Sequence, residues 1–428
     1  MTSFADSIVN DYGIAGGRFV NLLDYMEYMP NFAQTLVDYP EAQKMATEIN
    51  GEMYEFPGIA NDTTLVYMSS PYYRTDIFEA AGVTEEPTSV DELYDALVKI
   101  KDYTGEAPWA PDITNEITSW QNLVYSAFGT SCQMKFDADA DGNVFFARST
   151  EQMKNYYKYM NKLYSEGLIH QESVTMDNNT RKALETEGKV AIIEKASTTF
   201  TEASFADGVI HLGAVAPLTS EYDSTQTYID RSPVTFKGGP FLNADSDYIV
   251  EMCKMFDIMY ATEEVVEGTG LYGQSFTYGL EGVDWDFTNT SYTFHVPEGY
   301  TGASNTYRNT EVIWTNMGRV DAFAGMVTEE QGNAQVRQRL LVEKVHPYED
   351  PDQLYIWTYL KFTDDEQYII DNKLAIIETY YKKMAAEFIT GVTDIEANWD
   401  AYCAELDKMG IADVLEVYQA AYDRFMSN

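Results

Sequence analysis

The sequence is poor in cysteine, histidine and cationic residues. Its three cysteines, Cys132, Cys253 and Cys403, are odd in number and far apart, which argues against a disulfide framework and against a metal site. Its four histidines are scattered, and no spacing typical of metal ligands or of a histidine-dependent catalytic motif is present. The sequence therefore predicts no metal, no cofactor and no catalytic residue.

Positive charge is scarce as well. The chain carries 28 lysine and arginine residues against 69 aspartate and glutamate residues, a formal net charge of −41 at pH 7. So acidic a surface repels phosphate backbones and anionic lipids, and we expect neither a nucleic-acid partner nor binding to membrane surfaces. The acidity suits a neutral or cationic ligand, and it is equally compatible with a role in solubility alone.

Long apolar runs are also missing. No window approaches the length of a transmembrane helix, and residues 1–20 contain no apolar stretch typical of a signal peptide. The chain as given is therefore expected to be a soluble protein without a targeting signal.

The length and the hydrophobic pattern predict a two-lobe α/β protein. A chain of 428 residues exceeds one ordinary hydrophobic core. Apolar residues recur at helical spacing over 88–103, 150–166, 246–263 and the stretch from Leu415 to Phe425. Short strand-like runs lie at 64–68, 189–193, 210–216 and 291–296. Helices that alternate with short strands are typical of α/β folds.

The stretch DADADGN (137–143) looks like the start of an EF-hand calcium loop. Such a loop needs a bidentate carboxylate at its twelfth position, which here is Arg148. Asp141-Gly142, followed by the apolar run 144–146, instead predicts a hairpin turn, because Asp-Gly tolerates the positive φ of such turns. A weak surface calcium site at 137–143 is the remaining alternative.

The stretch GTGLYG (268–273) fits the dinucleotide-binding fingerprint. The fingerprint binds a pyrophosphate only where a strand precedes it and a helix follows it. Here an acidic helical pattern that ends in Glu263, Glu264 and Glu267 comes first, and these carboxylates would repel a pyrophosphate. A loop that ends this helix is the better interpretation.

Aromatic residues are plentiful, at 14% of the chain. Four of the six tryptophans lie in irregular segments among polar residues: Trp109, Trp120, Trp285 and Trp314. A sugar ring has an apolar C–H face and a rim of hydroxyls, so an indole beside an amide, carboxylate or guanidinium group suits it. We take these four as candidates for stacking on a ligand, although core packing is the commoner role of any single tryptophan.

Six segments are informative together: YEFPGI (54–59), YYRTDIFEAAGVTEEPTSVDELYDALVKIKD (72–102), KLYSEGLI (162–169), TYGLEGVDW (277–285), EFITGVTDIEANWDAYCAELDKMGI (387–411) and VYQAAYDRF (417–425). In this order they resemble the extracellular solute-binding lipoproteins of family 1 in ABC-type carbohydrate uptake. No single segment is diagnostic, but the set spans nearly the whole chain.

This resemblance implies a helix-rich α/β fold of the periplasmic-binding-protein type II, with a ligand in the cleft between two lobes. It also implies a carbohydrate ligand, most simply an oligosaccharide, and permease subunits of an ABC transporter as partners, with transport energy from a partner ATPase. The chain itself would be a monomer without enzymatic activity. We expect the first lobe to comprise 1–112 and 238–345, and the second 113–237 and 346–428.

The resemblance places an arginine–aspartate pattern on Arg74 and Asp76, and an ion pair between them at a helix start would serve structure equally well. The family's tryptophan position is occupied by Ile77 or Phe78, a departure from the pattern. The polar candidates for contact with sugar hydroxyls are Tyr72, Arg74, Asp62, Tyr278 and Glu281.

The start of the chain departs most from the family. Family members begin with a signal peptide, a lipid-attachment cysteine and an opening β-α-β portion, whereas FADSIV (4–9) matches a later point. We expect either an incomplete record of an extracellular, membrane-anchored lipoprotein or a reduced variant whose first sheet exposes an edge. The alternative functions are a carbohydrate-active enzyme, a glycoside hydrolase or lyase, and a non-transport scaffold derived from a binding protein.

Overall fold

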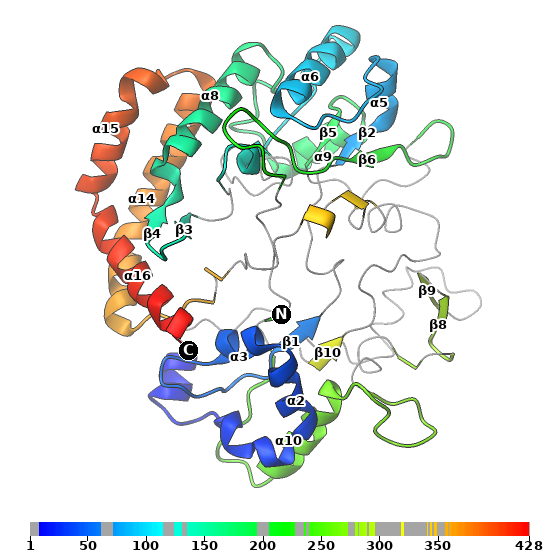
Figure 1. Ribbon diagram of the computed structural model, residues 1–428, viewed down its shortest axis with the longest axis vertical. Helices are drawn as coiled ribbons and strands as arrows, with labels where there is room; N and C mark the ends of the chain where they lie inside the picture. The colour runs from blue at the N-terminus through cyan, green and yellow to red at the C-terminus, as the bar shows by residue number, and fades with distance from the viewer. Residues whose placement is uncertain are drawn as a thin grey trace.

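The computed structural model describes residues 8–60, 72–113, 124–130, 135–194, 205–226, 235–236, 239–272, 279–280, 282–288, 291–295, 318–320, 340, 343–344, 346–348, 356–357 and 359–427. Within these residues the buried apolar side chains form two large cores, one in each of two lobes (Figure 1). A smaller cluster packs around the sheet of the second lobe.

The first lobe lies in the lower half of Figure 1. In its sheet, β1 (Gly58–Ala60) lies between a parallel β10 (Gly318–Val320) and an antiparallel β7 (Thr235–Phe236). Its helical elements include the π-helix Val9–Ile14, the 3₁₀ helix Leu22–Tyr28, α2 (Pro30–Asp38), α3 (Pro40–Ala46), α10 (Ile249–Asp257) and the 3₁₀ helix Ile258–Tyr260. The rings of Phe32, Phe56 and Tyr260 meet at the centre of the core.

The second lobe lies in the upper half and along one side of the view. In its sheet, β2 (Tyr72–Arg74) lies between β5 (Ile192–Ile193) and β6 (Leu212–Ala214), antiparallel to both. Its helices include α5 (Thr75–Ala80), α6 (Val90–Thr104), α8 (Glu151–Ser165), α9 (Asn178–Thr186), α14 (Asp364–Thr390), α15 (Ile395–Lys408) and α16 (Ile411–Ser427). Short 3₁₀ turns occur at Ala147–Ser149 and His346–Tyr348.

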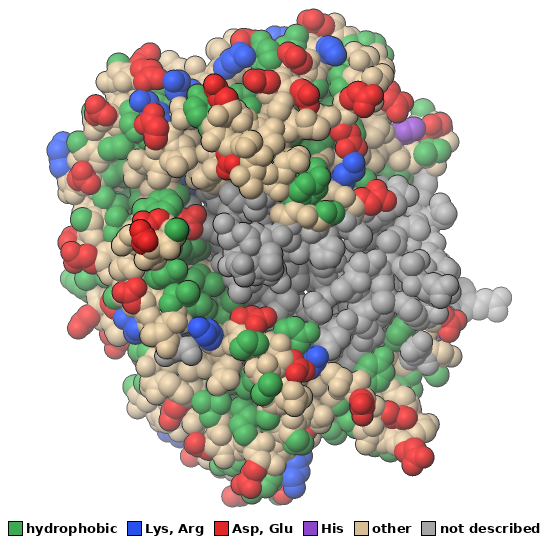
Figure 2. All heavy atoms as spheres, viewed as in Figure 1, with side chains coloured by type: hydrophobic (Ala, Val, Ile, Leu, Met, Phe, Trp, Pro, Cys, Tyr) green, Lys and Arg blue, Asp and Glu red, His purple; other side chains and the backbone are tan. Residues whose placement is uncertain are grey.

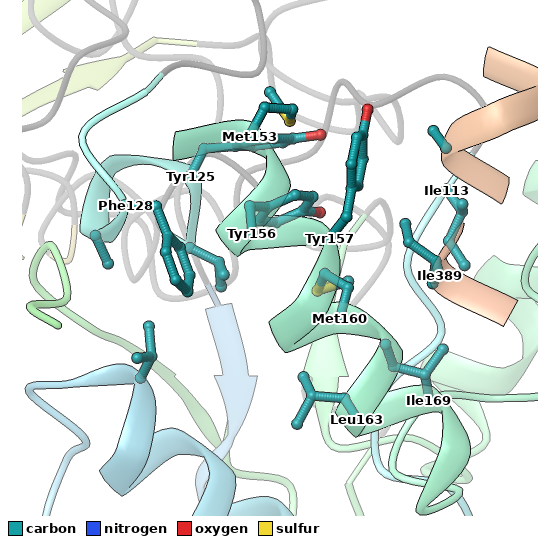
Figure 3. Packing of buried hydrophobic residues seen from close by; sticks show 14 of the residues in the cluster. Ile113, Tyr125, Phe128, Met153, Tyr156, Tyr157, Met160, Leu163, Ile169 and Ile389 are labelled. Atoms are coloured by element: carbon teal, nitrogen blue, oxygen red, sulfur yellow. The ribbon is translucent and has the colours of Figure 1, made fainter. Parts of the chain in front are cut away.

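Helix α8 shows why these sequences form amphipathic helices. Thr150 caps its first turn by accepting the N–H of Met153, and the buried side chains then recur every three or four residues. Figure 3 shows this face of α8 packed against Tyr125 and Phe128, with the ring of Tyr125 stacked on that of Tyr156 at a centroid distance of 3.9 Å. Each such buried side chain contributes roughly 1.5–3 kcal/mol.

The stretch DADADGN forms the hairpin that the sequence predicts. Strand β3 (Phe136–Ala138) pairs antiparallel with β4 (Val144–Phe146), and Gly142 in the turn has a φ of +84°. The carboxylate of Asp139 accepts the N–H groups of Asp141 and Asn143, at 3.0 and 2.8 Å, so it closes the loop. A second hairpin joins β8 (Trp285–Thr288) to β9 (Ser291–Phe294).

The other predicted elements agree in part with the structure. Helices α6, α8 and α16 cover three of the four predicted helical stretches, but α10 and its 3₁₀ extension span only 249–260 of the predicted 246–263. Residues 267–270 form a turn closed by a bridge between Val266 and Leu271, in keeping with a loop rather than a phosphate-binding helix start. The predicted strand 64–68 lies outside the described residues.

Core packing differs from the lobe boundary expected after residue 112. Phe78, Leu93 and Trp109 pack in one core with Tyr157 and Phe388, so residues 78–109 belong to the second lobe. The boundary expected from the sequence places this segment in the first lobe. The physical reason is that the apolar face of α6 is equally compatible with either core, and helical periodicity does not say which core a face meets.

Acidic side chains are distributed over both lobes on the face shown in Figure 2, with lysine and arginine side chains interspersed singly. This distribution agrees with the net charge of −41.

Candidate functional site

The sheets of the two lobes lie on the sides of the lobes that face each other (Figure 1). Strand β2 carries Tyr72 and Arg74, and its neighbour β5 is followed at once by Glu194. The N–H of Arg74 donates to the carbonyl of Ala191, and the N–H of Ala191 donates to that of Pro108, at 2.8 Å each. These bonds bring three of the predicted site residues, Tyr72, Arg74 and Trp109, into one neighbourhood.

Trp109 is held by a buried carboxylate. Its indole N–H donates to Oε1 of Glu194 at 2.6 Å, and the backbone N–H of Glu194 donates to Oε1 of Glu185, also at 2.6 Å. Trp109 is fully buried, whereas Glu194 is 8% exposed. A carboxylate beside an indole is a suitable pair of groups for a hydroxyl-rich ligand, because charge-assisted hydrogen bonds are stronger than neutral ones.

The segment that carries Trp109 is fixed from behind by Arg181 of α9. Nε of this fully buried side chain donates to the carbonyl of Ala110 at 2.8 Å, and its Nη1 lies 3.7 Å from Oδ2 of Asp112. A buried cation with several oxygen partners is costly to displace, so this contact makes the 109–112 segment a rigid support.

Arg74 forms an ion pair with Asp76, the structural alternative given above for these two residues. Nε and Nη2 donate to the two carboxylate oxygens at 2.8 and 2.5 Å, at the start of α5. The guanidinium carbon lies 4.7 Å from the ring centre of Phe205, and Gly188 leaves it room, since a Cβ there would lie 3.2 Å from Nη1. Tyr72 packs beside it in the small cluster around the sheet.

Trp285 lies elsewhere. It begins β8, its indole N–H donates to the carbonyl of Gly279 at 3.1 Å, and it is 3% exposed. The β8–β9 hairpin is well separated from the β5-β2-β6 sheet in Figure 1, so the structure does not bring Trp285 and Trp109 together. Both indoles pack as core residues do, and a stacking role for them remains a proposal.

The other predicted site residues lie outside the described part of the chain: Trp120, Trp314, Asp62, Tyr278 and Glu281. Sequence reasoning also missed two residues of the Trp109 neighbourhood, Glu194 and Phe205. A signal for Glu194 was present, because it is the first carboxylate after the apolar run VAII (190–193).

Among the described residues, no group of three or more histidine, cysteine, aspartate or glutamate side chains is arranged to hold a metal ion. No described helix combines the length and the apolar character needed to cross a membrane.

Comparison with known proteins defines the class of fold. No family model matches the chain. Its structure is similar to an HMO-binding, ABC-transporter-associated solute-binding protein from Bifidobacterium longum infantis, with a TM-score of 0.73, 21% identity, and coverage of 97% of this chain and 85% of that one. It is also similar to an EF-hand mutant of the Streptococcus pneumoniae ABC-transporter substrate-binding protein FusA in complex with fructo-nystose, with a TM-score of 0.67, 20% identity, and coverage of 100% and 87%. The chain therefore has the two-lobe α/β fold of solute-binding proteins, as predicted.

The sequence itself is similar to the fructooligosaccharide ABC transporter substrate-binding protein FusA of Streptococcus pneumoniae serotype 4. The two are 24% identical over 429 residues, which cover 94% of this chain and 75% of that protein. The chain is thus homologous to ABC-transporter substrate-binding proteins.

Proposed function

We propose that this chain is the substrate-binding component of an ABC transporter and captures an oligosaccharide between its two lobes without changing it chemically. The observation that carries the proposal is the sequence similarity to a fructooligosaccharide-binding protein over 94% of the chain. The acidic surface supports a neutral ligand over a phosphorylated one.

The finer features of the proposal follow the family resemblance. We place the protein among the family 1 solute-binding lipoproteins, outside the cell and anchored to its membrane. It would act as a monomer that delivers its ligand to permease subunits. The similarity to an ABC-transporter substrate-binding protein, which covers 94% of this chain and 75% of that protein, supports these assignments.

For the ligand site we retain the nine residues inferred from sequence and add Glu194. Its carboxylate accepts the indole N–H of Trp109, and its backbone N–H donates to Glu185, at the end of β5 on the sheet that faces the first lobe. We propose that it accepts a hydrogen bond from a sugar hydroxyl.

Isothermal titration calorimetry with a panel of oligosaccharides, beginning with fructooligosaccharides, tests the proposal. We expect binding by the wild type, and weakening of about tenfold or more in Glu194→Gln, since a hydrogen bond to a charged group contributes about 1.5–3 kcal/mol. Glu187→Gln is the matched control, because Glu187 is an exposed glutamate that pairs with Lys189.

Two outcomes would contradict the proposal. Release of new reducing ends during the titration would favour a glycoside hydrolase, and unsaturated products would favour a lyase. A complete lack of binding across the panel would favour a non-transport scaffold.

A further inference from the structure

The two lobes contact each other where α3 of the first lobe meets the end of α16 of the second (Figure 1). A cavity of about 110 Å³ lies at this junction. From the first lobe it is lined by Lys44, Thr47 and Glu48, and from the second by Lys361, Arg424 and Phe425.

An ion pair crosses this junction. Nζ of Lys361 donates to Oε1 of Glu48 at 2.6 Å, and the two side chains are only 14% and 9% exposed. By contrast, the pair Arg18–Asp245, which lies within the first lobe, is 62% and 68% exposed. Water and salt screen a shielded pair much less than an exposed one, so the attraction between Glu48 and Lys361 is the stronger of the two.

The backbone of each partner is fixed within its own lobe. The N–H of Glu48 donates to the carbonyl of Glu52 at 2.8 Å, in a turn closed by a bridge between Thr47 and Met53. The carbonyl of Lys361 accepts Nη2 of Arg424 at 2.9 Å, and Arg424 in turn pairs with Glu366 of α14. The ion pair therefore joins backbone segments that are fixed in different lobes. The distance between Glu48 and Lys361 consequently depends on how the lobes are arranged.

We propose that Glu48 and Lys361 form an interlobe latch that stabilises the lobe arrangement of this structure. Neither residue belongs to the candidate ligand site, so the latch acts on ligand affinity only through the equilibrium between lobe arrangements. This consequence for affinity rests on the proposed function, whereas the effect on the lobes does not. Removing either charge abolishes this shielded attraction across the junction, which disfavours the latched arrangement.

The test is the distance between the lobes without ligand. Spin labels at Tyr103→Cys and Tyr248→Cys, two exposed positions on different lobes, report it by pulsed electron paramagnetic resonance. The protein without introduced cysteines, treated with the same label, gives the background from its own thiols. Couplings between sites commonly change an equilibrium by about 5- to 150-fold, so we expect Glu48→Gln and Lys361→Met each to shift the ratio of distance populations at least about fivefold.

Two further variants make the result decisive. The charge exchange Glu48→Lys with Lys361→Glu should restore the wild-type distances, and Asp245→Asn, which breaks the exposed pair, should leave them unchanged. Far-ultraviolet circular dichroism of each variant verifies folding.

Distances that are identical in wild type, Glu48→Gln and Lys361→Met would overturn the latch, whether or not any oligosaccharide binds. Failure of oligosaccharide binding with a normal latch response would overturn only the proposed function.

Discussion

Asp137 and Asp139 show how one acidic stretch provides two different environments. Asp139 is exposed, and hydrogen bonds from the side chain and backbone of Asn143 lower the pKa of its carboxyl group. Asp137 is half-buried, and burial raises the pKa of its carboxyl group from 3.8 to about 6. At neutral pH the fold therefore carries a partly desolvated charge at residue 137.

We expect Asp137→Asn to stabilise the protein at pH 7.5 by about 1–2 kcal/mol, after allowance for solvent screening. Because the folded-state pKa of Asp137 is raised, the wild type loses stability as the pH rises from about 4 to 6, and the variant does not. Urea unfolding at pH 7.5 and pH 4.5 measures the difference, which should shrink at the lower pH. Asp141→Asn, at an exposed position of the same turn, is the control, and an equal gain in both variants would contradict the explanation.

At the residue scale, the sequence predicted those features of the structure that depend only on neighbouring residues in the chain. Asp-Gly predicted the turn at 141–142 because glycine adopts the φ of +84° found there at little cost. The burial of Trp109 was not predictable, because its indole pairs with Glu194, 85 residues away, and the adjacent Ala110 accepts a hydrogen bond from Arg181, 71 residues away. Glu194 follows the apolar run 190–193 directly, but its hydrogen bond with Trp109 joins positions 85 residues apart and was not predictable.

At the scale of elements, α14 illustrates how a helix start also joins two helices. The side chain of Thr363 accepts the N–H of Glu366, and the Glu366 carboxylate accepts the N–H of Thr363. The same carboxylate pairs with Arg424 of α16 at 2.8 and 2.5 Å. The capping box thus fixes the start of α14 and its contact with α16.

Thr363→Ala should lower the free energy of unfolding by about 1 kcal/mol, because the N-terminal cap is lost. Thr379→Ala, at an exposed position in the middle of the same helix, should be neutral or slightly stabilising, because alanine has the higher helix propensity. Urea unfolding followed by circular dichroism compares the two variants. A loss in Thr379→Ala as large as that in Thr363→Ala would show that the cap is not the cause.

Helix prediction was most accurate where the apolar periodicity is strong. The spacing over 88–103 predicted α6, which begins after the cap Ser89 and ends before Gly105, whose φ is +75°. Local sequence does not predict which lobe α6 joins, because this depends on the packing of Leu93 and Leu97 with residues far away in the chain. For this reason the second lobe was expected to begin only after residue 112. In the structure, α5 and α6 already pack with the core of the second lobe.

At the scale of the whole molecule, the order of the segments predicted the fold better than any single motif did. The expected two-lobe α/β fold is confirmed by solved structures that match 97% or more of the chain. The ligand site was less accessible to sequence reasoning, because residues from separate segments must meet in space before their roles can be assigned.

Lobe closure around an unaltered oligosaccharide is the central claim, and small-angle X-ray scattering with and without a bound oligosaccharide tests it most directly. We expect the radius of gyration to fall when a fructooligosaccharide that binds in calorimetry is added, because closure of the two lobes makes the particle more compact. A sugar that gives no heat of binding is the control. An unchanged radius of gyration at saturation, or recovery of a cleaved sugar from the sample, would contradict the claim.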